Sequence, residues 1–117
     1  MTVLNLIEQT PFVTKDGSQI RSILDRTNAP VQLQSLAEAT VQAGGSTQRH
    51  YHKMSEEFYF ILEGSGRTEI DGETREVRMG DAILIPAGAW HTIAAEERLR
   101  FLCCCAPPYS HEDTYFA

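Results

Sequence analysis

Short strand-like segments separated by strong turn signals constrain the fold of this chain more than any other feature. Residues 31–41 alternate apolar and polar side chains, as expected for a strand with one buried face. Asp71-Gly72 separates two further segments and is typical of a tight hairpin turn. Pro86 and Pro107 end two apolar segments. At least seven short strands, with a turn about every 8 to 12 residues, predict an all-β sandwich or barrel.

The ends of the chain are harder to place from sequence. Residues 18–26 hold apolar side chains at helical spacing, so they are compatible with a helical turn or with an edge strand. We interpret residues 1–117 as a single domain, with an arm over 1–30 outside the barrel, the barrel over 31–108 and a tail over 109–117. The tail has aromatic residues and is expected to dock, a second subunit being one candidate. The unplaced arm and tail, together with open sheet edges, predict a homodimer.

Charge and hydropathy exclude several function classes. Sixteen acidic residues against ten basic ones give a formal charge of −6, which argues against a nucleic-acid partner. No apolar segment approaches the roughly 20 residues that span a membrane, and the first residues do not resemble a signal peptide. The cysteines are consecutive, Cys103 to Cys105, and cannot form a conventional disulfide framework. We therefore expect a cytoplasmic protein with no membrane partner.

Three histidines and a glutamate form the strongest chemical signal. His50 and His52 are two residues apart, so on a strand both imidazoles project from one face. Glu57 begins the next apolar strand, and His91 follows a Pro-Gly turn, so both are able to reach the histidine pair. Glu56 is an alternative carboxylate but has the wrong parity for that strand. Imidazole and carboxylate together suit iron, manganese, nickel, copper or zinc, whereas calcium and magnesium prefer oxygen ligands.

The spacing of these residues resembles the two signature motifs of the cupin superfamily. The first motif is Gly44-x5-His50-x-His52-x4-Glu57-x6-Gly64, and the second is Gly80-x5-Pro86-x-Gly88-x2-His91. One position differs, because Ala95 stands where cupins often have asparagine. The resemblance implies an antiparallel jelly-roll barrel, the double-stranded β-helix. It also implies a divalent transition metal in the barrel mouth, with His50, His52, Glu57 and His91 as its ligands.

The resemblance narrows the function to chemistry on a small molecule. A metal with open coordination positions can bind a substrate directly, or a substrate together with dioxygen. We expect a metalloenzyme of the dioxygenase type acting on a small diketone, phenolic or carboxylate substrate. Tyr59 shares the parity of Glu57 and is the candidate catalytic residue, as a hydrogen-bond donor or acid, with a purely structural role as the alternative.

Two other function classes use the same site. A sugar or sugar-acid isomerase or epimerase would require inward Lys, Arg and Asn side chains, and strand parity reveals no such cluster. A non-catalytic small-molecule-binding cupin is the third candidate.

The cysteine run is interpreted as structural. Strand alternation places Cys103 and Cys105 on the face of Phe101, and Cys104 on the face of Leu102. Both faces are apolar, so the strand is expected to be buried on both sides. Burial raises the pKa of a thiol and makes it a poor nucleophile, so all three cysteines are expected to be unreactive.

Overall fold

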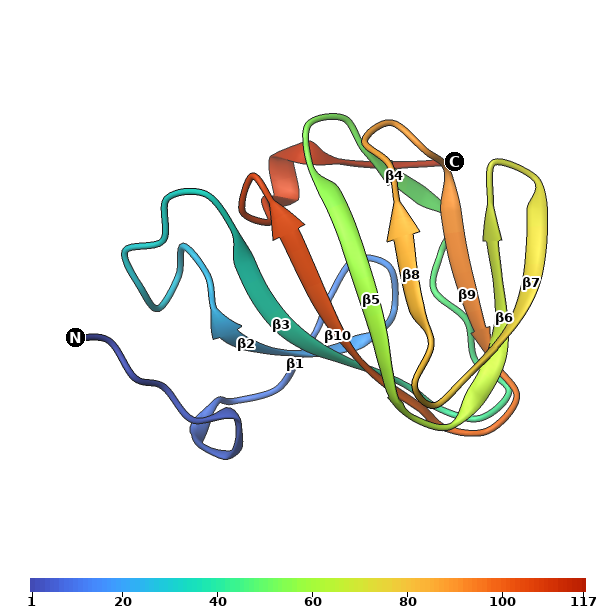
Figure 1. The fold of residues 1–117 in the computed structure, drawn as a ribbon, viewed down its shortest axis with the longest axis horizontal. Coiled ribbons are helices and arrows are strands. Elements are labelled where there is room, and N and C mark those ends of the chain that lie inside the picture. The colour runs from blue at the N-terminus through green and yellow to red at the C-terminus, as the bar shows by residue number, and fades with distance from the viewer.

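Two antiparallel β-sheets make up most of the structure, a computed structural model that describes residues 1–117 (Figure 1). The larger sheet has the strand order β1-β2-β3-β10-β5-β8, and the smaller one has the order β11-β4-β9-β6-β7. The strands are β1 (Phe12–Val13), β2 (Gln19–Leu24), β3 (Ser35–Val41), β4 (His50–His52), β5 (Glu56–Glu63), β6 (Ser65–Ile70), β7 (Glu73–Arg78), β8 (Ala82–Ile85), β9 (His91–Ala95), β10 (Leu99–Ala106) and β11 (Thr114–Phe116). The expected all-β jelly-roll barrel is confirmed.

Helical structure is limited to two short 3-10 turns. These are η1 (Leu6–Glu8) and η2 (His111–Asp113). Neither has the length or apolarity to cross a membrane.

The core lies between the two sheets and follows the period-2 alternation of the strands. On β5, Glu57, Tyr59 and Ile61 are buried, whereas Glu56 and Phe58 point outward. Side chains from the other strands complete the core, including Val41, Ile83, Ile85, Ile93, Leu99 and Phe101. Burying each large aliphatic or aromatic side chain contributes about 1.5–3 kcal/mol, so this interface is the main source of stability.

Two turns between strands require the residue types that the sequence has there. Asp71 (φ 48°) and Gly72 (φ 88°) form the predicted hairpin between β6 and β7, with both residues at positive φ. Gly64, between β5 and β6, has φ 91°, and a Cβ atom there would lie 2.0 Å from the carbonyl oxygen of Arg98. Only glycine fits at this position.

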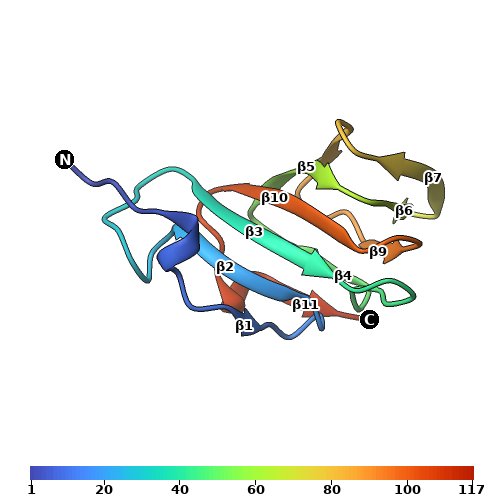
Figure 2. The ribbon, with the colours of Figure 1, turned by 90° about the horizontal axis from the view of Figure 1, so that it is seen from below.

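The N-terminal segment contributes strands to the larger sheet. β2 pairs with β3, with Ile20 opposite Ala39, and β1 pairs with β2. The helical alternative for residues 18–26 is therefore wrong, because pairing along β3 outweighs the local spacing of the apolar side chains. Part of the segment interpreted as an outer arm belongs to the sheet, while the first residues extend away from the barrel (Figures 1 and 2).

The strand expected over residues 31–41 is shorter than its alternating pattern suggests. β3 begins only at Ser35, and Leu33 is 80% exposed. Its neighbour β10 ends at Ala106, one residue before Pro107, and its other neighbour β2 ends at Leu24. Residues 31–34 therefore have no strand to pair with, whatever their alternation.

The C-terminal tail docks on its own barrel. β11 lies beside β4 at the edge of the smaller sheet (Figure 2), with Tyr115 opposite Tyr51 and their rings stacked at 5.0 Å. No second subunit is required to accommodate the tail.

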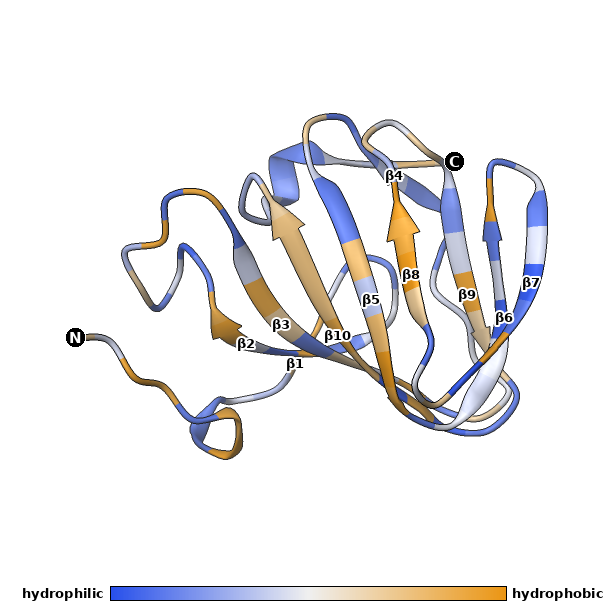
Figure 3. Cartoon of the chain, viewed as in Figure 1, coloured by the Kyte–Doolittle hydropathy of each residue, from blue (hydrophilic) through white to orange (hydrophobic).

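Hydrophobic residues concentrate in β3, β10, β5 and β8, whereas β7 is largely hydrophilic (Figure 3). Some of this hydrophobicity faces outward. Phe58 is 51% exposed, Phe60 43% and Leu84 56%, and Phe58 lies opposite Leu84 in the register of β5 and β8. The outer face of the larger sheet therefore carries an apolar patch.

Candidate metal centre

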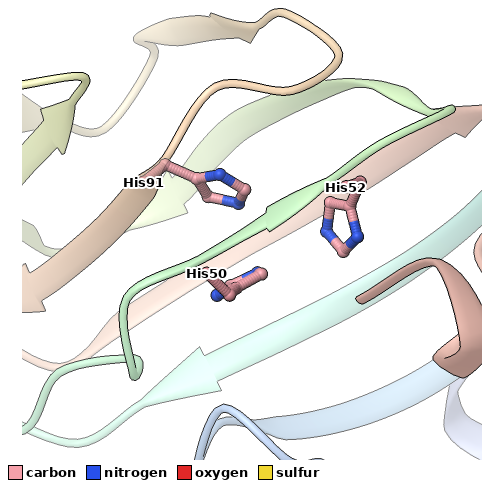
Figure 4. Close-up of side chains that lie close together, drawn as sticks. All are labelled: His50, His52 and His91. Carbon is pink, nitrogen blue, oxygen red and sulfur yellow. The ribbon is translucent and has the colours of Figure 1, made fainter. Parts of the chain in front are cut away.

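Three buried imidazoles converge between β4 and β9. His50 and His52 project from the same face of β4, as their spacing predicts, and His91 begins β9 directly opposite His50. One ring nitrogen from each histidine lies within 4.8 Å of the others, and the rings point toward a common space (Figure 4). The loop before β9 is held to β4, because Gly88 donates its N–H to the carbonyl oxygen of His52 at 2.7 Å. The structure thus brings together all three predicted histidines.

A backbone carbonyl orients each of these rings through the Nδ1 atom. The distances are 2.7 Å from His50 to Gln48, 3.0 Å from His91 to Ala89 and 3.2 Å from His52 to Asp113. A carbonyl oxygen only accepts hydrogen bonds, so Nδ1 carries the proton and donates. In a neutral ring the Nε2 atom is then left with its lone pair, which is the arrangement that metal-binding histidines use.

Glu57 completes the cluster from β5. Its Oε1 atom lies 3.4 Å from Nε2 of His52 and 3.6 Å from Nε2 of His91. Glu57 Oε1 and His91 Nε2 are both buried, and neither has a hydrogen-bond partner. Unpaired buried polar atoms are rare in proteins and require an explanation. A divalent transition metal would satisfy both atoms, so the donor set present here fits such an ion.

The charges of these groups depend on one another. Burial raises the pKa of Glu57, but the nearby imidazoles of His52 and His91 outweigh it and hold the pKa well below its usual value. Burial lowers the pKa of His52, but Glu57 outweighs this effect and raises it overall. The pKa of His50 is lowered by burial and by the charge of His91. An ionised carboxylate beside neutral imidazoles is the form that binds a metal.

Glu57 has a partner that the sequence interpretation missed. The Cys105 thiol donates a hydrogen bond to Oε2 of Glu57 at 3.2 Å. Alternation correctly placed Cys105 and Phe101 on one face of β10, but that face was expected to be purely apolar. The register of β5 and β10, which sets Cys105 opposite Glu57, is the signal that would have revealed the contact.

A cavity of about 290 Å³ opens beside the cluster. His50, His52, Glu57 and Tyr59 line it, and residues of the N-terminal segment and the tail form its outer walls. Cys103 and Cys105 also line it, and Cys104 on the outer face is only half-buried. The expectation that this strand is buried on both sides by apolar surroundings is therefore wrong. The volume suits a compact organic molecule.

Two basic residues on the wall, Lys15 and Arg26, were not anticipated. They belong to the segment that we expected outside the barrel, so strand parity within the barrel did not reveal them. Neither forms an ion pair, whereas the nearby carboxylates Asp16 and Asp25 accept hydrogen bonds within their own turns. Two positive charges therefore border the cavity, together with the carboxylates of Asp16, Asp25 and Glu112.

Tyr59 lies on the cavity wall, as its parity predicts. Its ring packs against Phe101 at 4.5 Å and lies 6.2 Å from the ring of His91. Burial, with a smaller contribution from Glu57, raises its pKa well above the ordinary value. The hydroxyl therefore stays protonated and is able to donate a hydrogen bond.

Comparison with known proteins identifies the family of this chain. The Cupin domain family matches residues 37–105, a range that holds His50, His52, Glu57 and His91. The chain belongs to the cupin family. Within this cupin, Ala95 replaces the asparagine common in the family, and its backbone pairs with Gly44 and Gly45.

The proteins similar to this chain include an uncharacterized protein and two enzymes. An uncharacterized protein of Methanocaldococcus jannaschii is 49% identical over 106 residues, which cover 89% of this cupin and 85% of the relative. A dimethylsulfoniopropionate lyase of Ruegeria pomeroyi is 40% identical over 82 residues, covering 69% of this cupin and 53% of the lyase. Among solved structures, the polyketide cyclase RemF of Streptomyces resistomycificus is 27% identical, with a TM-score of 0.77 and coverage of 97% and 89%. The family thus includes enzymes with different reactions.

Proposed function

We propose that this cupin is a metal-dependent enzyme that acts on a small organic substrate in the barrel mouth. The observation that carries the proposal is the unpaired buried pair, Glu57 Oε1 and His91 Nε2, inside a cluster of three histidines that borders a cavity. His50, His52, Glu57 and His91 would hold a divalent transition metal. Structural metal sites are closed by protein ligands, whereas a site beside a cavity has room for a substrate.

The metal and the side chains around it would have different roles in catalysis. When bound, the metal would supply a Lewis acid with open positions for substrate atoms. The protonated Tyr59 hydroxyl would donate a hydrogen bond to the substrate, or a proton where negative charge develops on it. Cys105 would hold the carboxylate of Glu57, and the aromatic wall at Phe101 would exclude water.

A dioxygenase reaction on a small diketone, phenolic or carboxylate substrate is the first activity to test. The apolar wall at Phe101 and the size of the cavity support a compact, partly apolar substrate. The experiment is oxygen consumption by the iron-loaded protein across a panel of such compounds. The expected result is uptake with at least one compound that is lost in the metal-free protein. No uptake with any compound would reject this reaction type.

A reaction without oxygen is the second candidate, and one observation favours it. Lys15 and Arg26 border the cavity without ion-pair partners, and such groups would bind the carboxylate of a sugar acid or another organic acid. The Ruegeria relative is named as a lyase, which is consistent with chemistry of this kind. Isomerisation or elimination of organic acids by the zinc-loaded protein under nitrogen would support this candidate. Metal-dependent binding of such acids without turnover would instead indicate a binding cupin.

A further inference from the structure

Asp113, in the C-terminal tail, holds the turn that joins two of the metal-site strands. Its carboxylate accepts hydrogen bonds from the backbone N–H groups of Lys53 and Met54 at 3.0 Å and of Ser55 at 3.1 Å. These residues form the connection between His52, at the end of β4, and Glu57, near the start of β5. Hydrogen bonds to an ionised acceptor are roughly twice as strong as neutral ones. One tail residue thus fixes the whole turn.

The same residue also contacts the imidazole of His52. The backbone carbonyl oxygen of Asp113 accepts the Nδ1–H group of His52 at 3.2 Å. Thr114, the next residue, lies opposite His52 in the register of β11 and β4, and its Oγ1 atom is 3.4 Å from the same nitrogen. For His50 and His91, the equivalent carbonyl comes from two residues earlier in the chain. Only His52 depends on a segment about 60 residues away for its orientation.

We propose that Asp113 is a positioning residue for the metal centre, and this inference rests on the metal site of the proposed function. Its carboxylate sets the path of the turn, and so the placement of Glu57 relative to His52. Its carbonyl fixes the tautomer and the ring orientation of His52. Groups that orient metal ligands in this way typically change metal affinity about 10–100-fold when they are removed.

Coupling of this kind acts in both directions. If docking of the tail strengthens metal binding, metal binding must stabilise docking of the tail by the same free energy. The turn at residues 53–55 should therefore open less often when the metal is present, and its backbone N–H groups should exchange with solvent more slowly.

The test compares Asp113→Ala and Asp113→Asn with a neighbouring control in the full-length chain. The control is Glu112→Gln, because Glu112 is exposed and its side chain bonds only to Ser110, the residue that precedes the same 3-10 turn. Zinc affinity is measured by competition with a chromophoric chelator, and the visible spectrum of the cobalt-loaded protein reports the ligand geometry.

Asp113→Ala removes the carboxylate and keeps the backbone carbonyl, so it should weaken zinc binding about tenfold, the low end of the range, and alter the cobalt spectrum. Asp113→Asn should give an intermediate loss, because its amide keeps one acceptor oxygen, and Glu112→Gln should match the parent protein. Wild-type affinity together with a wild-type spectrum in Asp113→Ala would overturn the inference.

Hydrogen exchange measured on the unaltered protein tests the inference even if Asp113→Ala does not fold. Addition of zinc should slow exchange at the amides of Lys53, Met54 and Ser55. Unchanged exchange at these amides, in a protein that binds zinc, would overturn the inference about Asp113 but not the proposed metal site. Failure of the unaltered protein to bind any metal would overturn the proposed metal site as well.

Discussion

The Oε1 atom of Glu57 lies 3.4 Å from the Nε2 atom of His52, and both side chains are buried. A buried carboxylate beside a neutral imidazole is costly unless another group compensates its charge. The cluster supplies partial compensation, because the pKa of His52 is raised and that of Glu57 is lowered. A bound cation would complete the compensation of this charge. Substitution of Glu57 is therefore the most direct test of the site.

Glu57→Gln should weaken zinc binding by at least about tenfold, corresponding to roughly 1.4 kcal/mol. The amide keeps the shape of the side chain but removes its negative charge. Glu56→Gln is the matched control, since Glu56 is adjacent on β5 but exposed on the outer face. Competition titration of both variants measures the difference. Equal zinc affinity in the two variants would remove Glu57 from the ligand set.

Tyr59→Phe should lower turnover of an identified substrate by about 10²–10⁴-fold if the hydroxyl acts as a general acid. The ring would still pack against Phe101, so metal content and folding should not change. Tyr51→Phe is the control, because Tyr51 lies on the opposite face of β4 and stacks on Tyr115. Steady-state kinetics with metal analysis distinguishes these cases. Full activity in Tyr59→Phe would leave Tyr59 with a packing role only.

Cys103, Cys104 and Cys105 should react slowly with a thiol reagent in the native protein at pH 7. Burial raises the pKa of each thiol, so little thiolate is present. Labelling of the native protein should still be accelerating at pH values above about 8.5, where the rate of an ordinary thiol levels off, and all three should label rapidly after unfolding. Mass spectrometry of labelled peptides gives the rate at each position. Rapid native labelling of Cys103 or Cys105 that metal slows would show instead that the cavity holds a reactive thiol.

We propose a homodimer on structural grounds that differ from those suggested by the sequence. The tail and β2 are accommodated by a single barrel, so they give no reason for a second copy. Apolar side chains exposed on the outer face of the larger sheet give such a reason, namely Phe58, Phe60 and Leu84. The edge strand β8 of this sheet is also open to pairing with another chain. Light scattering should give twice the chain mass, and Phe58→Glu should halve it. A monomer mass for the unaltered protein at micromolar concentration would reject the dimer.

Local patterns were sufficient to predict an all-β sandwich or barrel and the shared face of His50 and His52. The jelly-roll topology and the full ligand set with His91 followed from the resemblance to the cupin motifs, because His91 meets His50 only through the pairing of β4 and β9. Side-chain alternation placed His50 and His52 on one face, and the same rule separated Glu57 from Glu56. The Asp71-Gly72 hairpin follows from the conformational preferences of its two residues. Features of this kind need no knowledge of which strand pairs with which.

Contacts between distant segments were not predictable in the same way. The hydrogen bond from Cys105 to Glu57 depends on the register of β10 and β5. Lys15 reaches the cavity only because β1 and β2 join the larger sheet. The contact of Asp113 with His52 requires the tail to pair with β4. Neither local propensity nor spacing specifies such pairings, which depend on the assembled barrel.

Metal content of the purified protein tests the central claim most directly. After reconstitution and removal of free metal, elemental analysis should find about one divalent transition-metal ion per chain, because the cluster forms one site. His52→Ala should lose this ion, whereas His111→Ala should retain it, since His111 is the exposed histidine outside the cluster. Full metal occupancy in His52→Ala, or no bound metal in the folded parent protein, would contradict the account.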